Sequence, residues 1–153
     1  MAAEVRRRVL AIASGGGHWV QLLRLRPAFE GCDVSFATVH AASAADLAPG
    51  ARLFTFRDAS RKDWWRFVVS GAQIAAILLR VRPHVVVTTG AMPPLAALLF
   101  GRLIGARTLW IDSVANSEEF SGSGRLAKRF ATQVVTQWPQ LATPETPCWG
   151  SVL

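Results

Sequence analysis

The chain has 153 residues, which suits one domain, so we expect residues 1–153 to form a single domain. A hydrophobic content of 51% excludes a disordered tail, because a chain this apolar can bury a core. Seventeen Lys and Arg against ten Asp and Glu give a net charge of +7, which excludes an acidic solvating domain and favours anionic partners: phosphates, nucleic acid or an anionic lipid surface.

Short apolar runs alternate with longer helical patterns along the chain. The ranges expected to form strands are 8–13, 33–39, 53–56, 84–88, 108–111 and 134–138, with a last short strand at 149–153. The ranges expected to form helices are 18–29, part of 41–50, 61–82, 91–105 and 125–132, and residues 112–124 and 139–147 are expected to be loops. Strands and helices that alternate with short connections predict an α/β fold, a Rossmann-like doubly wound parallel sheet.

The two cysteines, Cys32 and Cys148, form no CxxC pair. We therefore expect a reducing compartment, no disulfide framework, no metal and no cofactor. The glycines at 15–17 interrupt the first apolar run, so no signal peptide is expected. The longest apolar candidate, Phe67–Leu79, is shorter than the roughly 20 residues of a membrane span, so any membrane contact is expected to be peripheral.

The start of the 61–82 helix is the candidate membrane-binding segment. Trp64, Trp65, Arg66 and Phe67 combine basic and aromatic side chains, as interfacial helices do. A core helix with a buried Trp pair, or a subunit interface, would explain the same residues. Nucleic acid is not an expected partner, because the chain has no recognition-helix pattern and no basic run beyond Arg6–Arg8.

The first loop of chemical interest, residues 13–18, joins the first strand to the first helix. Consecutive glycines let backbone N–H groups approach a phosphate or sugar closely at a helix N-terminus. His18, where this loop enters the helix, is a candidate general base, with a purely structural role as the alternative. Of the other histidines, His84 is expected to be structural, and His40 stays undecided.

This loop is not a dinucleotide fingerprint. Val20 stands where the third glycine belongs, and the second strand ends near His40 without an acidic residue for a ribose. A P-loop lysine is also missing. We therefore do not expect nucleotide hydrolysis of that type.

Two further loops follow strands at the same expected edge of the sheet. Residues 88–94 place Thr88, Thr89 and Gly90 before a helix, where the threonines could bind a ligand or serve as N-caps. Residues 112–119 begin with Asp112, a candidate for acid–base work or for binding sugar hydroxyls, or else a solvated loop residue. The residues expected to bind substrate are Ser14, Gly15, Gly16, Gly17, Thr89, Gly90, Ser113 and Asn116, and the candidate catalytic residues are His18 and Asp112.

Five motifs in this order resemble a known family. They are residues 14–18 (Ser-Gly-Gly-Gly-His), 88–91 (Thr-Thr-Gly-Ala), 111–115 (Ile-Asp-Ser-Val-Ala), 121–125 (Ser-Gly-Ser-Gly-Arg) and 136–139 (Thr-Gln-Trp-Pro). Together they resemble the membrane-anchoring, acceptor-side subunit of the split UDP-N-acetylglucosamine transferase of lipid-linked oligosaccharide synthesis. They resemble even more its bacterial counterparts in exopolysaccharide biosynthesis.

The resemblance implies the N-terminal half of a GT-B glycosyltransferase. It also implies a polyprenyl-diphosphate-linked sugar as acceptor, a separate chain that binds the UDP-sugar, and a place at the cytoplasmic face of the inner membrane. Members of this family in eukaryotes begin with a spanning helix, which we do not expect here. Their segment equivalent to residues 112–116 usually reads Glu-Ser-x-Ala-Arg, whereas this chain has Asp112 and Asn116.

The sequence thus predicts one subunit of a two-chain, inverting, UDP-sugar-dependent hexosyltransferase that is inactive alone. The first alternative is a non-catalytic scaffold that recruits a complete glycosyltransferase to the membrane. The second is a stand-alone nucleotide-binding enzyme, against which the missing third glycine and ribose acid argue.

Overall fold

The computed structural model of the protein describes residues 6–59 and 62–153. A six-stranded sheet forms its centre, in the spatial order β3-β2-β1-β4-β5-β6, and every neighbouring pair is parallel. The strands are β1 (Arg8–Ile12), β2 (Asp33–Thr38), β3 (Arg52–Thr55), β4 (Val85–Thr88), β5 (Arg107–Ile111) and β6 (Gln133–Val135). The predicted doubly wound parallel sheet is confirmed.

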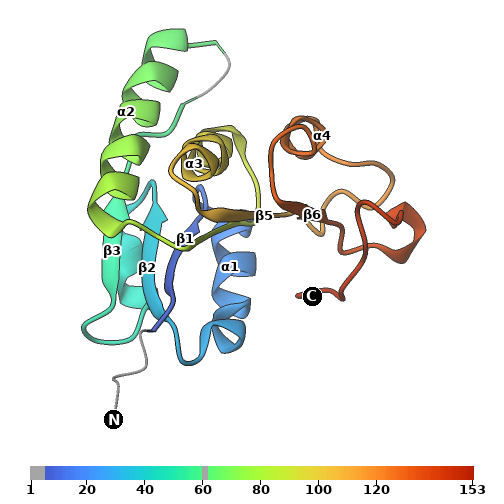
Figure 1. Ribbon diagram of the computed structural model, residues 1–153, viewed down its shortest axis with the longest axis horizontal. Helices are drawn as coiled ribbons and strands as arrows, with labels where there is room; N and C mark the ends of the chain where they lie inside the picture. The colour runs from blue at the N-terminus through green and yellow to red at the C-terminus, as the bar shows by residue number, and fades with distance from the viewer. Residues whose placement is uncertain (1–5, 60–61) are drawn as a thin grey trace.

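Helices cover both faces of this sheet (Figure 1). On one face lie α2 (Trp64–Val81), α3 (Met92–Leu103) and α4 (Gly122–Ala127), and on the other lies α1 (Gly17–Arg24), followed by the short 3-10 helix η1 (Arg26–Phe29). Two further 3-10 helices, η2 (Ala41–Asp46) and η3 (Pro139–Leu141), belong to connecting loops.

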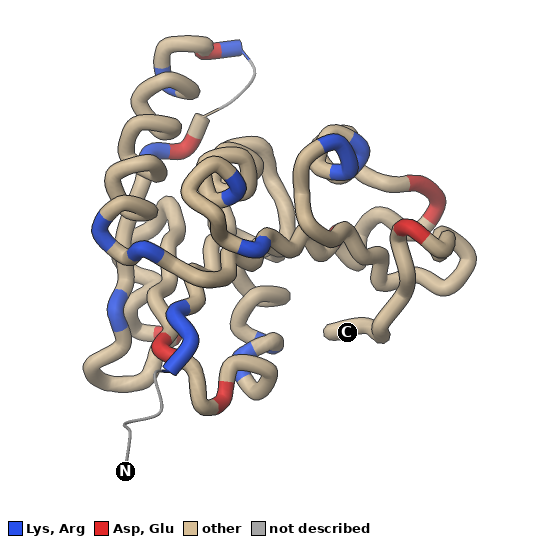
Figure 2. Tube along the Cα trace, viewed as in Figure 1, with Lys and Arg blue, Asp and Glu red and all other residues tan. Residues whose placement is uncertain are grey.

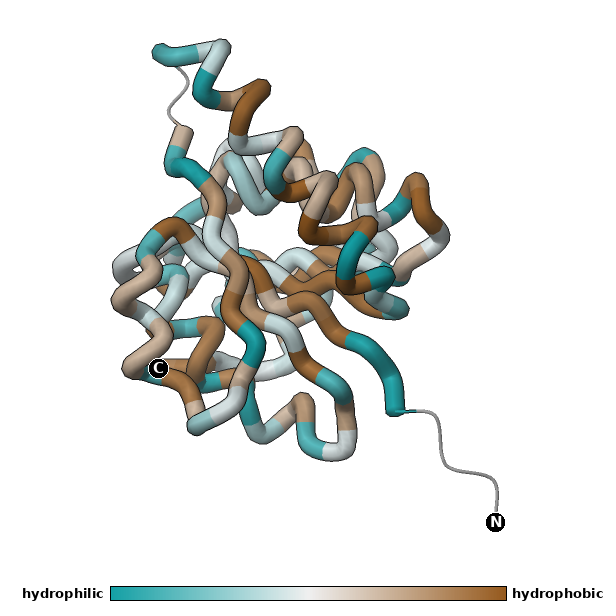
Figure 3. Tube along the Cα trace, turned by 90° about the vertical axis from the view of Figure 1, so that its left-hand side faces the viewer, coloured by the Kyte–Doolittle hydropathy of each residue, from teal (hydrophilic) through white to brown (hydrophobic). Residues whose placement is uncertain are grey.

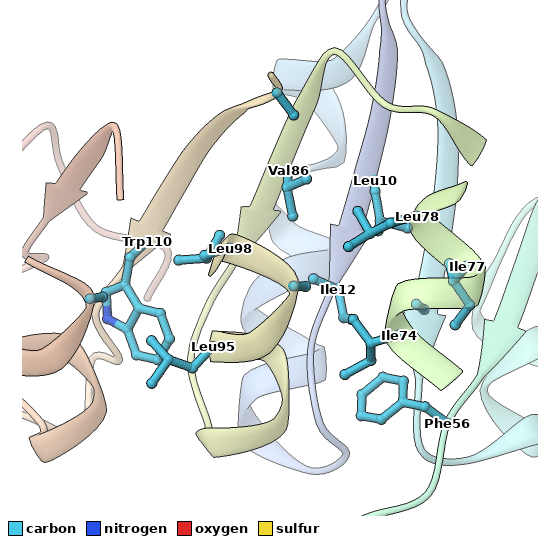
Figure 4. Close-up of a cluster of buried hydrophobic side chains, with 14 of the residues drawn as sticks. Leu10, Ile12, Phe56, Ile74, Ile77, Leu78, Val86, Leu95, Leu98 and Trp110 are labelled. Atoms are coloured by element: carbon cyan, nitrogen blue, oxygen red, sulfur yellow. The ribbon is translucent and has the colours of Figure 1, made fainter. Parts of the chain in front are cut away.

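Alternation along the strands divides the core between these two faces. Leu10 and Ile12 of β1 pack under α2 and α3, where they meet the fully buried Ile74 and Leu98 (Figure 4). Ala11, one step along the strand, faces α1 instead. In the view coloured by hydropathy, the strands carry hydrophobic stretches through the middle of the molecule, while the start of the described chain is hydrophilic (Figure 3).

Several predicted boundaries were wrong. The helix expected at 18–29 ends at Arg24 and gives way to η1, because Pro27 has no N–H to donate to an α-helical carbonyl. The helix expected at 125–132 is α4, which begins three residues earlier: the Ser121 side chain accepts a hydrogen bond from the Gly124 N–H and caps its N-terminus.

The C-terminal segment is not the strand expected at 149–153. Thr136 makes a single parallel bridge with Cys148, and no strand follows it. Side chains hold the segment instead: the Val152 N–H donates to Gln137 Oε1 and the Arg24 guanidinium donates to the Val152 carbonyl. This tail therefore packs beside α1 through side-chain hydrogen bonds rather than through the sheet.

Helix α2 differs from its prediction in one respect that matters for function. The helix begins at Trp64, so the predicted start was too early for residues 62 and 63, and Arg61, the predicted first residue, lies outside the described residues. By length and composition α2 is long and apolar enough to cross a bilayer, contrary to the expectation from the sequence. A third of this segment is nevertheless buried, because Ile74, Leu78 and Val81 pack on the sheet, so α2 is a covering helix of the domain with its other face outward.

Candidate functional site

The candidate residues meet at the carboxyl edge of the sheet, where ligands bind in folds of this kind. A pocket of about 360 Å³ lies between the loops that follow β4 and β5 and the start of α1. Its lining includes His18, Gly90, Asp112, Ser113 and Asn116 from the predicted set. Three helices, α1, α3 and α4, begin at this pocket, so the partial positive charges of their N-termini favour an anionic group there.

His18 is held in one orientation by the chain around it. Its Nδ1 lies 3.0 Å from the carbonyl oxygen of Thr89, so Nδ1 carries the proton and donates it to that oxygen. The Thr89 hydroxyl in turn donates to the His18 carbonyl at 2.6 Å. This pair of bonds fixes the ring and leaves Nε2 of the neutral imidazole as the unprotonated atom, which is what a general base requires.

The backbone after β4 makes room for this ring. A Cβ added to Gly90 would lie 2.7 Å from His18 Nδ1 and Cε1, and the residue also has a φ of +131°, so glycine is required here for space and for conformation. Ala91, which also lines the pocket, has a φ of 79°, a value that L-residues rarely adopt. Such strain at the start of α3 is typical of ligand-binding segments.

Asp112 accepts hydrogen bonds from four donors of the protein itself. Its Oδ1 accepts from Trp110 Nε1 at 3.0 Å and from the Ser121 hydroxyl at 2.6 Å. Its Oδ2 accepts from the Ser121 N–H at 3.0 Å and from Asn116 Nδ2 at 3.3 Å. The side chain is only 2% exposed, and these four donors use the four acceptor sites of a carboxylate. Asp112 therefore orients the loop and the start of α4.

Two glutamines that the site prediction left out tie the site loops together. Gln21 on α1 donates to the Ser113 hydroxyl and accepts from the Val114 N–H, at 3.0 and 3.1 Å. Gln137, after β6, donates to Gln21 Oε1 and to the Asp112 carbonyl, both at 2.9 Å. Gln137 stood in the resembled motif, but a buried Gln on α1 becomes visible only when the helix and the loop are seen side by side.

The remaining predicted residues lie around the pocket rather than in it. Gly15 lies against His40, so close that a Cβ would come within 2.6 Å of the ring, and Gly16 and Gly17 form the exposed start of α1. Thr89 is fully buried, so its side chain serves the His18 loop and does not reach a ligand. Ser14 lies in the same turn, where its carbonyl accepts from the Thr38 hydroxyl.

Other expectations about the loops have clear outcomes. Neither Thr88 nor Thr89 caps α3, whose N-cap residue is Ala91. His84 makes a structural contact, as predicted: its Nδ1 accepts from the backbone N–H of Arg8 at the opposite edge of the sheet.

The predicted membrane-binding residues lie on the outward face of the helices that cover the sheet. Trp64 is 75% exposed and Trp65 is 47% exposed, and the Arg66 guanidinium lies 5.3 Å from the Trp65 ring centroid. Phe67 lines an apolar groove of about 490 Å³ between α2, α3 and α4, in which no charged side chain takes part among the described residues. The Trp pair is therefore not the buried core pair considered as an alternative.

The sequence was compared with protein-family models and with known proteins. No protein-family model matches the sequence. The chain is 28% identical over 167 residues to the UDP-N-acetylglucosamine transferase subunit ALG14 of Eremothecium gossypii, an alignment that covers 89% of this chain and 75% of that protein.

Solved structures match the fold at much lower identity. MurG of Acinetobacter baumannii matches with a TM-score of 0.77 and 14% identity, over 96% of this chain and 46% of that one. The chain has the fold of a GT-B half-domain. A UDP-N-acetylglucosamine 2-epimerase from Rickettsia bellii matches with a TM-score of 0.69 and 10% identity, over 96% of this chain and 45% of that one. The chain thus spans less than half the length of these solved structures, and what it matches is the N-terminal half of GT-B enzymes.

Proposed function

We propose that the chain is the acceptor-side, membrane-binding subunit of a two-chain glycosyltransferase. It would act on a polyprenyl-diphosphate-linked acceptor in polysaccharide biosynthesis, at the cytoplasmic face of the membrane, while a partner chain binds the UDP-sugar. The observation that carries this proposal is the similarity to ALG14, which is named as a subunit of a UDP-N-acetylglucosamine transferase and is matched over 89% of this chain and 75% of that protein. The GT-B half-domain fold supports the same proposal.

The geometry of the site suggests different roles for the two candidate catalytic residues, His18 and Asp112. His18 Nε2 would accept the proton of the acceptor hydroxyl as that oxygen attacks the sugar of the donor, which inverts the anomeric carbon in a single displacement. Asp112 would keep Ser121 and Asn116 in place at the pocket wall. The N-termini of the converging helices would stabilise diphosphate charge.

Membrane contact would come from the outward face of α2 and α3. The exposed apolar residues on this face and at its ends include Trp64, Trp65, Val68, Leu79, Leu99, Leu103 and Ile104. Exposed apolar surface of this extent, with basic residues at its ends, is typical of a protein that inserts side chains into the interfacial region of an anionic bilayer. A spanning segment is not needed for such contact.

The experiment that tests the proposal purifies the tagged chain from its native membranes, identifies the co-eluting chains and assays the complex for UDP-sugar transfer onto lipid. We expect a second chain to be required for transfer. Tight nucleotide binding or transfer by the isolated chain would overturn the two-chain proposal in favour of a stand-alone enzyme.

Two substitutions at His18 separate proton transfer from ring positioning. His18→Ala removes the ring, whereas His18→Asn keeps a side-chain N–H that can still donate to the Thr89 carbonyl but offers no basic nitrogen. We expect both variants to lose transfer by a factor of about 10² or more while they retain the partner and the fold. Normal transfer by His18→Asn would remove the general-base role. If substitutions in all the loops were silent while Trp64 and Trp65 remained necessary, the chain would be a membrane scaffold.

A further inference from the structure

A second concavity lies far from the candidate site, at the amino edge of the sheet. It has a volume of about 800 Å³ and lies where β1, β4 and β5 begin and where α2 and α3 end. Its polar side chains are those of Arg7, Arg8, Arg82, Arg107 and His84, and no acidic residue takes part in its lining. The basic segments around this end of the sheet are visible in the view coloured by charge (Figure 2).

The negative C-terminal ends of helices balance only part of this positive charge. Two helices end here, and each carries roughly half a negative charge at its C-terminus, about one charge together. Arg8 serves this purpose directly, because its Nε donates to the carbonyl of Arg82, the residue that caps α2, at 2.8 Å. The ion pairs found among the described residues involve Arg52, Arg66 and Arg125, and none of the cavity arginines. Roughly three positive charges in the cavity are therefore not balanced by the described structure.

His84 adds a donor of known direction to this set. Its Nδ1 accepts from the Arg8 N–H at 3.1 Å, so the N–H of the neutral ring is at Nε2. Guanidinium groups with a further N–H donor form the combination that holds phosphate oxygens in proteins.

One wall of the cavity is apolar and continues onto the outward face of the helices. Leu78, Leu79 and Ile104 line it, and Leu79 and Ile104 are 65% and 45% exposed. A charged concavity that opens beside exposed aliphatic side chains matches a ligand with a phosphate group at one end and hydrocarbon at the other.

We propose that this cavity at the amino edge is a phosphate-binding site, which in the membrane-bound protein holds the phosphate headgroup of an anionic lipid. It would be independent of the pocket at the carboxyl edge, because the two lie at opposite ends of the same strands. Headgroup binding here would add a fixed point of attachment to the apolar contact made by α2 and α3.

The test compares two pairs of arginine substitutions that change net charge equally. Arg7→Gln with Arg107→Gln removes two exposed cavity arginines, whereas Arg102→Gln with Arg129→Gln removes two exposed arginines that are absent from the cavity lining. Binding of the full chain is measured to inorganic phosphate, by amide chemical shifts, and to vesicles of phosphatidylcholine with or without phosphatidylglycerol. We expect the cavity pair to weaken binding to the phosphatidylglycerol vesicles at least about tenfold and the control pair by less than about threefold.

The outcomes distinguish a free anion from a lipid headgroup as the source of the phosphate. They also distinguish failure of this proposal from failure of the proposed function. Saturable shifts at Arg7, His84 and Arg107 with inorganic phosphate, lost in the cavity pair, would show a site that also takes a free anion. Loss confined to vesicles would show a site that needs the lipid. Equal weakening by both pairs, or no weakening by either, would overturn the site and leave only general attraction of a basic protein. Failure of transfer with Trp64 or Trp65 substitutions would bear on the proposed function alone, because those residues contribute nothing to the cavity.

Discussion

Replacement of Asp112 by Asn tests whether this carboxylate is a structural acceptor or a base. The substitution keeps the shape of the side chain but turns one of its two oxygens into an NH₂ donor. Both oxygens accept two hydrogen bonds in the native structure. In either orientation of the new amide, its NH₂ group therefore lies opposite two hydrogen-bond donors.

The cost can be worked out from the partners. If the NH₂ occupies the Oδ1 position, the Ser121 hydroxyl can rotate and accept, but the indole N–H of the fully buried Trp110 is left unpaired. If it occupies the Oδ2 position, the Asn116 amide can flip, but the Ser121 main-chain N–H cannot. One orphaned donor costs about 1–3 kcal/mol, and the bonds that remain lose their charge assistance. We expect a total loss of about 2–4 kcal/mol, which lowers the melting temperature of a domain this size by roughly 5–15 °C.

The assay is thermal and urea unfolding of Asp112→Asn beside a matched control, Asp46→Asn. Asp46 also accepts from an indole, Trp19 Nε1 at 2.9 Å, but it is exposed, so its amide can turn its oxygen to the indole at a cost below about 0.5 kcal/mol. Equal and small changes in the two variants would refute the reasoning, because the four bonds would then contribute nothing. A stable Asp112→Asn variant without transfer activity would instead restore Asp112 as a base.

Three further substitutions test the site and the membrane face. Gly90→Ala should displace the His18 ring and strain a backbone of positive φ; we expect about 2 kcal/mol or more of lost stability together with lost transfer, measured by unfolding and activity on the same preparation. Gly17→Ala meets no atom within 4 Å, so stability should hold or rise by about 0.5 kcal/mol, and a fall in transfer would show that a ligand approaches this backbone. Trp64→Ser with Trp65→Ser should weaken vesicle binding at least about tenfold with little effect on unfolding, and unchanged binding would remove this helix from the membrane contact.

The fold was predictable from the sequence because each level of pattern pointed to the same arrangement. Residues 85–87 are three consecutive valines, which is the pattern of parallel strands covered on both faces, and the structure places Val85–Thr88 as β4 in the middle of the sheet. Errors came where a single residue decided an end. Pro27 ends α1 early, and Ser121 starts α4 inside what reads as a loop.

The site was predictable only in part, because loops were visible in the sequence but the partners of each side chain were not. Glycine and strand-end positions led to His18, Gly90 and Asp112, which do meet at one pocket. The distinction between a free imidazole nitrogen and a fully occupied carboxylate depends on contacts between residues as distant as Asp112 and Ser121 or His18 and Thr89. Gln21 was missed for the same reason, since its partners Ser113 and Gln137 are brought to α1 by the sheet order and not by the sequence.

The distribution of charge in the molecule indicates which chain would stabilise the leaving group in the proposed reaction. No lysine or arginine is among the described residues that line the carboxyl-edge pocket, although the chain carries a net charge of +7. The diphosphate of a UDP-sugar carries about two negative charges and gains about one more as UDP leaves, and partial helix charges of about half a unit each cannot balance this total alone. If the chain is the acceptor half of such an enzyme, the cations that stabilise UDP must therefore come from the donor-binding chain. This predicts that His18→Ala abolishes transfer without changing the affinity of the complex for the UDP-sugar, whereas substitution of basic residues on the partner's facing surface weakens that affinity. An equal loss of UDP-sugar affinity in His18→Ala would contradict this division.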